Sequence, residues 1–217
     1  MEQQHAEYSG AGFLIEYARA HDDQSFEKVL GEAVRILEGT AVPYVLIGGV
    51  ASTCFGRRRR TKDVDVFLRP EDVQTAFDAF GEQGFETEKT DSTWLFKAMK
   101  DGVVVDLIFR PTGGFYLDEE MIHRSTTVRF MGHQVRFISP EDLLILKVVA
   151  YDEASPRHWF DALSIIAATK LDWGSLLERA RRAPRRILSL LTYAQALDIW
   201  VPRQVVRTLF ERLEDQG

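Results

Sequence analysis

Three aspartates are the residues of this sequence whose type and spacing best fit chemistry. Asp63 and Asp65 alternate with Val64 and Val66, so in a strand both carboxylates lie on one face. Neighbouring carboxylates repel each other, a divalent cation relieves the repulsion, and hard oxygen ligands favour Mg²⁺ or Mn²⁺. The pair therefore predicts a metal site, and a solvated strand face is the alternative for the pair taken alone.

The third carboxylate, Asp106, lies in the middle of the apolar run VVVDLIF. A buried acid without a partner is costly, so Asp106 needs either a metal ion or a salt bridge to an arginine. If its strand pairs beside residues 63–68, the three acids form one metal-binding cluster. Asp106 would then lie close enough to accept a proton from an attacking hydroxyl.

The residues before this cluster have the character of a phosphate-binding turn. Gly48 and Gly49 end the apolar run YVLI and open a short helix, so backbone N–H groups and the helix N-terminus can approach phosphate oxygens. Ser52 offers a hydroxyl donor and Lys62 offers positive charge. The alternative is that the two glycines only make a turn. Four consecutive arginines follow: Arg57, Arg58, Arg59 and Arg60. They either bind a polyanion or form a solvated loop.

The elements that position these residues follow from hydrophobic periodicity and turn residues. The pair Asp101-Gly102 is typical of a tight hairpin turn between two strands. In this half of the chain the expected helices cover 25–38 and 70–83, and the expected strands cover 44–47, 63–68, 85–88, 93–99 and 102–109, with a further hairpin over 128–137.

From Ser139 onward the pattern is helical throughout, and Ser139 and Asp142 have the spacing of a helix-capping box. The expected helices lie at about 140–153, 156–169, 173–182, 186–198 and 203–214. We therefore predict an α+β fold in which a mixed sheet flanked by helices packs on a C-terminal helical bundle. The predicted division gives residues 1–138 to the catalytic core and residues 139–217 to the helical domain, with the active site between them.

Composition restricts the class of protein further. The 217 residues are 45% hydrophobic and 28% charged, as in soluble globular proteins, and the net charge of -6 argues against a uniformly basic nucleic-acid coat. The single Cys54 excludes an internal disulfide and a multi-cysteine zinc site. Because no apolar run reaches the roughly 18 residues of a membrane span, we expect a cytoplasmic protein with no membrane partner.

The order of the motifs resembles the nucleotidyltransferase superfamily related to DNA polymerase β. The matching segments are Gly48-Gly49-Val50-Ala51-Ser52, then Asp63-Val64-Asp65, then the lone Asp106. The resemblance implies that the glycine turn holds a nucleoside triphosphate, that Asp63 and Asp65 bind two Mg²⁺ ions, and that Asp106 serves the second ion and the incoming hydroxyl. It also implies the reaction, transfer of a nucleoside monophosphate from an NTP to an acceptor hydroxyl with release of pyrophosphate.

A narrower resemblance is to the bacterial toxin-type nucleotidyltransferases, the AbiEii-like abortive-infection toxins and their mycobacterial relatives from toxin–antitoxin pairs. The segments SPEDLLILKVVAY and SPRHWFDAL carry it. Those families place a Lys in the first helix and a Lys/Arg-Asp-x-x-Asp pattern in the next, which implies that Lys147, Arg157 and Asp161 face the nucleotide. His158 stands where those families commonly have Asp. The resemblance further implies an RNA acceptor, above all the tRNA 3′ end, and a cognate antitoxin. The last fifty residues resemble no family.

Three functions stay open at this point. The toxin resemblance and the arginine clusters favour RNA as the acceptor; the second cluster consists of Arg181, Arg182, Arg185 and Arg186. A small-molecule acceptor, as in the aminoglycoside-modifying nucleotidyltransferases, suits the negative net charge because those substrates are cationic. A catalytically silent nucleotide- or partner-binding module is the third possibility, and the complete set of three aspartates argues against it.

Overall fold

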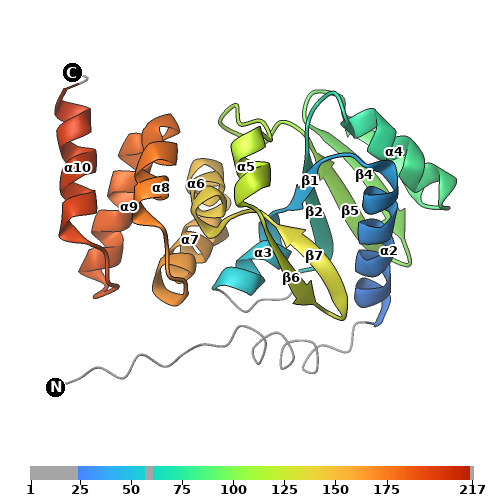
Figure 1. Ribbon diagram of the computed structural model, residues 1–217, viewed down its shortest axis with the longest axis horizontal. Coiled ribbons are helices and arrows are strands. Elements are labelled where there is room, and N and C mark those ends of the chain that lie inside the picture. The colour runs from blue at the N-terminus through green and yellow to red at the C-terminus, as the bar shows by residue number, and fades with distance from the viewer. Residues whose placement is uncertain (1–23, 57–60, 216–217) are drawn as a thin grey trace.

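The computed structural model describes residues 24–56 and 61–215, whose strands form one seven-stranded sheet of order β3-β4-β5-β2-β1-β7-β6 (Figure 1). Parallel and antiparallel pairs both occur in it, so the prediction of an α+β fold with a mixed sheet is confirmed. The strands are β1 (Tyr44–Leu46), β2 (Asp63–Leu68), β3 (Glu86–Asp91), β4 (Leu95–Lys100), β5 (Val103–Ile108), β6 (Thr126–Phe130) and β7 (His133–Phe137).

Two strand pairings set the positions of the aspartates. β2 pairs in parallel with β5, which places Asp65 directly opposite Asp106 and confirms that these strands are neighbours. β4 and β5 form an antiparallel hairpin through Asp101 and Gly102, whose φ angles of 50° and 76° are those of the tight turn that the sequence predicts. The hairpin places Lys97 opposite Asp106 on the other side of β5.

Helices α2 (Gln24–Thr40) and α4 (Val73–Glu82) pack against each other and against β5, at the right of Figure 1. The short helix α3 (Gly48–Phe55) follows β1 and packs against β2, α6 and α7. Along β2, Val64 and Val66 are fully buried, whereas the alternating aspartates are only partly buried. The alternation therefore separates an apolar face of the strand from a carboxylate face, as expected.

The helix α5 (Glu119–Arg124) is not among the helices predicted from the sequence, although local signals for it exist. Asp118 is its N-cap and accepts a hydrogen bond from the Met121 backbone N–H at 2.8 Å. Arg179 joins this cap to the C-terminal helices, because its guanidinium donates to Asp118 at 3.0 Å and to Asp142 at 2.7 Å.

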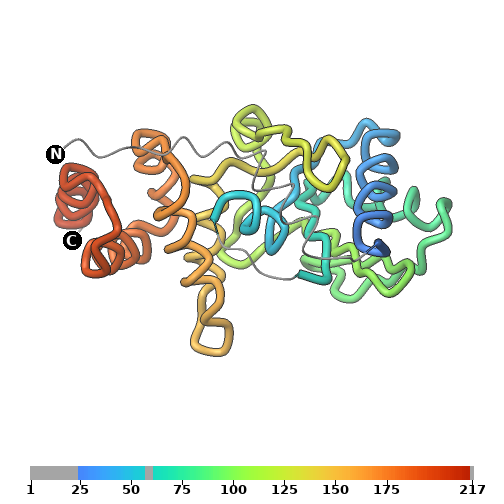
Figure 2. The backbone as a smooth tube through the Cα atoms, turned by 90° about the horizontal axis from the view of Figure 1, so that it is seen from below, coloured from blue at the N-terminus to red at the C-terminus, as the bar shows by residue number. Residues whose placement is uncertain are grey.

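The helices after residue 139 stand beside the sheet, at the left of Figure 1, and Figure 2 shows them extending away from it. They are α6 (Pro140–Ala150), α7 (Arg157–Ala168), α8 (Trp173–Arg179), the 3₁₀ turn η1 (Ala180–Arg182), α9 (Pro184–Ala196) and α10 (Arg203–Glu214). α6 is their centre: it contacts α3, α7, α8 and α9, and every residue from 141 to 148 is buried. Ser139 caps α6 by accepting from the Asp142 N–H at 3.1 Å, as its spacing predicts.

None of the helices in the described residues has the length and apolar character that crossing a membrane would need.

Candidate active site

Asp63, Asp65 and Asp106 converge at the start of α3, and we call them the carboxylate triad. Each contributes a carboxylate oxygen, and these oxygens all lie within 4.8 Å of one another. The parallel register of β2 and β5 explains the convergence, because Asp65 and Asp106 are direct cross-strand neighbours. Oxygen donors at this separation fit a hard divalent cation such as Mg²⁺ or Mn²⁺, which would offset the repulsion among the three charges.

Asp65 is the most perturbed member of the triad. Desolvation raises its pKa to about 6, and the nearby charge of Asp63 acts in the same direction. The Gly49 N–H opposes this rise by donating to Asp65 Oδ2 at 3.2 Å. The carboxylate thereby caps the N-terminus of α3, where the N-cap Ile47 supplies no side-chain bond. Ionisation of Asp65 in the folded chain therefore costs free energy, and a bound cation would remove that cost.

Gly48 is required by the close approach of the backbone to Asp65. Its φ of +67° lies in the left-handed region, and a Cβ at this position would stand 1.8 Å from Asp65 Oδ2. Ser52 braces the same turn: its fully buried hydroxyl donates to the Gly48 carbonyl at 2.7 Å. The structure therefore explains why residue 48 is a glycine: without a side chain there, α3 can begin directly against the carboxylate of Asp65.

The backbone before β2 holds Asp63 in place. Thr61 donates its hydroxyl to Asp63 Oδ1 at 2.6 Å, and the Lys62 N–H donates to the same oxygen at 3.2 Å. Lys62 thus contributes through its main chain, while the residue itself is exposed. The arginines at 57–60, predicted as a polyanion site, lie outside the described residues.

Asp106 has a lysine as its salt-bridge partner, where the sequence analysis expected an arginine or a metal ion. The ammonium of Lys97 lies 3.2 Å from Asp106 Oδ1. Desolvation raises the pKa of Asp106, the positive charge of Lys97 opposes the rise, and the nearby charge of Asp63 adds to it.

Lys147 and Asp161 link the C-terminal helices to the triad. Lys147 on α6 pairs with Asp161 on α7 at 3.0 Å, and both residues are buried. The positive charge of Lys147 also lowers the pKa of Asp65, so the ammonium acts on the triad from the side of the helices. Arg157 is exposed at the first position of α7, four residues and about one helical turn before Asp161.

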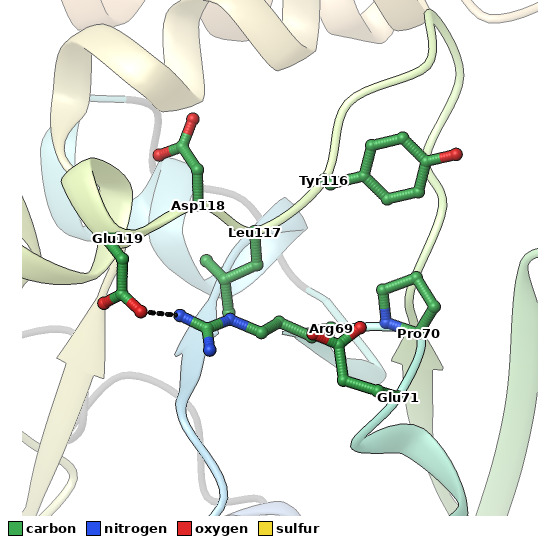
Figure 3. A pocket seen from close by; sticks show the side chains of 7 residues that line it. All are labelled: Arg69, Pro70, Glu71, Tyr116, Leu117, Asp118 and Glu119. Atoms are coloured by element: carbon green, nitrogen blue, oxygen red, sulfur yellow. Dashed lines mark hydrogen bonds and ion pairs between the residues drawn. The ribbon is translucent and has the colours of Figure 1, made fainter.

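Two hollows of the described surface lie away from the triad. One, of about 380 Å³, lies between Arg69 and Pro70, just after β2, and the segment before α5; in it Arg69 pairs with Glu119 at 2.6 Å (Figure 3). The other, of about 460 Å³, lies between α2 and the hairpin of β6 and β7. Neither of these two hollows is lined by a triad residue, and the candidate site is defined by the chemistry of the triad.

Residues 26–215 match the family described as "Nucleotidyl transferase of unknown function (DUF2204)". The chain belongs to this family. The prediction from the sequence that this chain is a nucleotidyltransferase is confirmed at the level of the family. The narrower resemblance to toxin-type enzymes stays a prediction.

Solved structures add a likeness of fold to this family assignment. The solution structure of the antibiotic-resistance factor ANT(2'')-Ia is similar with a TM-score of 0.55 and 16% identity, over 80% of this chain and 98% of that chain. The same factor in complex with adenylyl-2''-tobramycin has a TM-score of 0.50 and 15% identity, over 75% and 99%. The lincomycin-bound lincosamide antibiotic adenylyltransferase LnuA has a TM-score of 0.48 and 15% identity, over 65% and 97%. No curated protein matches the chain.

Two residues at the site of this DUF2204 member were missed from the sequence. A signal for Lys97 was present, because a two-residue turn at Asp101 and Gly102 sets the register of β4 and β5 and so places Lys97 opposite Asp106. Thr61, which binds Asp63, had a weaker signal as a hydroxyl two residues before the first acid.

Proposed function

We propose that this chain catalyses metal-dependent transfer of a nucleoside monophosphate from an NTP to an acceptor hydroxyl. The observation that carries the proposal is the convergence of three carboxylates within 4.8 Å, directly beside the glycine turn that opens α3. Family membership supports the class of reaction. A silent binding module would have no need for three acids that repel one another in this way.

The residues divide the work as follows. Asp63, Asp65 and Asp106 would hold Mg²⁺ or Mn²⁺, which would supply positive charge to the triphosphate and to the leaving pyrophosphate. The start of α3 offers its positive end to the phosphates, and Gly48 lets the backbone approach them closely. Asp106 would take the proton of the acceptor hydroxyl while that oxygen forms a bond to the α-phosphorus and the bond to the β-phosphate breaks. Lys147, held by Asp161, would add positive charge on the side of α6.

For the acceptor we propose a cationic small molecule that bears a hydroxyl. ANT(2'')-Ia, which shares the fold, is described as an antibiotic-resistance factor and was solved with adenylyl-2''-tobramycin, and the negative net charge of this chain suits a cationic acceptor.

The second arginine cluster has fewer side chains available to bind RNA than its sequence suggested. Arg186 donates to the carbonyls of Val148, Val149 and Tyr151 at 2.9 to 3.0 Å, and so caps the end of α6. Arg182 lies over the ring of Phe115, 5.2 Å from its centre. Two of the four arginines therefore have structural partners within the chain. The tRNA 3′ end, favoured from the sequence, becomes the alternative that the experiment must separate.

The test is a transfer assay with each of the four α-labelled NTPs and Mg²⁺, offered either a panel of aminoglycosides and lincosamides or total tRNA. We expect label on a small molecule, with release of pyrophosphate, and at least a hundredfold loss of rate in Asp65→Asn (compare the losses of about 10²-fold or more when a single electrostatic group is removed). Asp78→Asn, an exposed acid on α4, is the matched control. Label on tRNA alone would reassign the acceptor, and full activity in Asp65→Asn would refute the role of the triad.

A further inference from the structure

We propose that the hollow between α2 and the hairpin of β6 and β7 is a second binding site, which takes a small anion that bears a phosphate group. Figure 1 shows the helix beside the hairpin, and the two elements contact each other. None of the described residues that line the hollow belongs to the carboxylate triad. The inference therefore goes beyond the proposed function, and either can fail without the other.

The hollow has the size and the wall of a small-molecule site. Its volume of about 460 Å³ lies within the range that such pockets usually have. Its wall includes His133, whose imidazole packs directly on the backbone of α2 at Gly31. A Cβ on Gly31 would stand 2.3 Å from His133 Cε1. The glycine therefore lets the hairpin approach the helix, with the imidazole against the helix as part of the wall.

Hydrogen-bond donors from the helix and from both strands line the hollow. Gln134 and Arg136 alternate along β7 and so share one face of it, and Thr127 on β6 lies directly opposite Arg136. Arg35 comes from α2. A guanidinium binds phosphate oxygens through paired N–H groups, while an amide or a hydroxyl adds a single hydrogen bond. This set of donors is typical of a site that recognises phosphate.

The charges of the lining favour an anion. Within the part of the chain that the structure describes, neither Arg35 nor Arg136 forms an ion pair, and Arg35 donates only to a neutral amide, that of Gln83 at 3.1 Å. Glu38, the one carboxylate among the described lining residues, accepts from the Tyr44 hydroxyl at 2.8 Å. Two guanidinium charges thus stand against one carboxylate. Because Arg136 is half-buried, it lacks a counter-charge that a bound anion would supply.

The experiment is isothermal titration calorimetry of the full chain with inorganic phosphate, pyrophosphate or AMP, in EDTA so that no metal ion loads the triad. Arg136→Gln and Arg35→Gln each remove a positive charge from the lining. The matched control is Arg129→Gln on the same hairpin, an exposed arginine outside the lining that loses the same charge. Glu38→Gln removes the negative charge and keeps an acceptor for the Tyr44 hydroxyl.

A second pair of variants tests the place by shape instead of charge. Gly31→Ala pushes the imidazole of His133 out of its contact with α2, whereas Gly39→Ala, on the same helix, meets nothing within 4 Å. Backbone amide chemical shifts of the wild type, measured by NMR with and without each anion, show independently where the anion binds.

For at least one of the three anions we expect a dissociation constant below about 1 mM, with amide shifts that change in α2, β6 and β7. Arg136→Gln and Arg35→Gln should bind about tenfold more weakly, because each removes charge-assisted hydrogen bonds. Gly31→Ala should also bind more weakly, Glu38→Gln more tightly, and the two controls as the wild type does. Tightest binding of AMP would identify an organic phosphate as the occupant, and tightest binding of phosphate or pyrophosphate an inorganic one.

Three results would overturn the inference. They are no binding of any of the three anions by the folded wild type, equal weakening in Arg129→Gln and Arg136→Gln, and shift changes confined to the triad and the start of α3. The arginines of the hollow would then be a solvated surface. Each of these results leaves the proposed transfer reaction in place, because its test uses the triad and a bound metal ion.

Discussion

Replacing Asp65 by asparagine should stabilise the metal-free protein above about pH 6. The ordinary pKa of the carboxyl is 3.8 and its pKa in the folded chain is about 6, chiefly because of desolvation. The folded state therefore binds the proton more tightly than the unfolded state does. The stabilisation provided by protonated Asp65 is complete below about pH 4 and is lost as the pH rises through about 6.

The size of the effect follows from the same two values. A difference of 2.2 pKa units, from 3.8 to about 6, corresponds to about 3 kcal/mol of unfolding free energy. This is an upper value, because neighbouring groups relax around the charge. Asparagine never ionises, and its side-chain oxygen can still accept the Gly49 N–H. The variant should therefore match the wild type near pH 4 and exceed it in stability by up to about 3 kcal/mol at pH 7 to 8.

Urea unfolding in EDTA at intervals from pH 4 to pH 8 measures this difference. Addition of Mg²⁺ should then stabilise the wild type, since an ion that binds only the folded state raises its stability by mass action, and should leave Asp65→Asn nearly unchanged. If the two stability curves run parallel from pH 4 to pH 8, the carboxylate is not strained in the fold. Equal stabilisation of both proteins by Mg²⁺ would refute the role of Asp65 as a ligand.

Two further substitutions test the surroundings of the triad. Gly48→Ala forces a Cβ to within 1.8 Å of Asp65 Oδ2 at a φ of +67°, so we expect about 1 to 3 kcal/mol of destabilisation and at least tenfold weaker Mn²⁺ binding by titration. Gly39→Ala, where a Cβ meets nothing within 4 Å, is its control, and equal behaviour of the two variants would contradict the steric argument. Lys147→Met removes the ammonium that pairs with the buried Asp161 at 3.0 Å and should lower the unfolding free energy in urea by up to about 3 to 5 kcal/mol. The double variant Lys147→Met/Asp161→Asn should recover part of this loss, and a double variant as unstable as the sum of both single variants would show that the pair does not interact.

Much of the candidate site depends on local geometry, which is why it is readable in the sequence. Asp63 and Asp65 share a face because side chains alternate along any strand. Ser139 caps α6, and the Asp101-Gly102 turn joins β4 to β5, because short-range hydrogen bonds and positive φ angles decide both. Even the register that places Lys97 at Asp106 follows from that turn, although the sequence analysis did not use it.

Other parts of the site depend on contacts between distant segments. No local signal states that β5 pairs in parallel with β2, about forty residues earlier in the chain, yet this pairing alone brings Asp106 to Asp65. The burial of Lys147 with Asp161 arises only when α6 and α7 pack together. Arg186 illustrates the same limit, because a basic cluster in the sequence proves in part to be a helix cap.

The sequence by itself thus determined the set of chemical groups and the family of reactions: three acids, a glycine turn and the order in which they follow one another. Only the tertiary structure decided which charges face which. The physical reason is that charge interactions depend on distances of a few ångströms and on burial, and both are set where strands and helices from separate parts of the chain meet. The contact of Lys97 with Asp106, 3.2 Å apart on neighbouring strands, is a property of that packing.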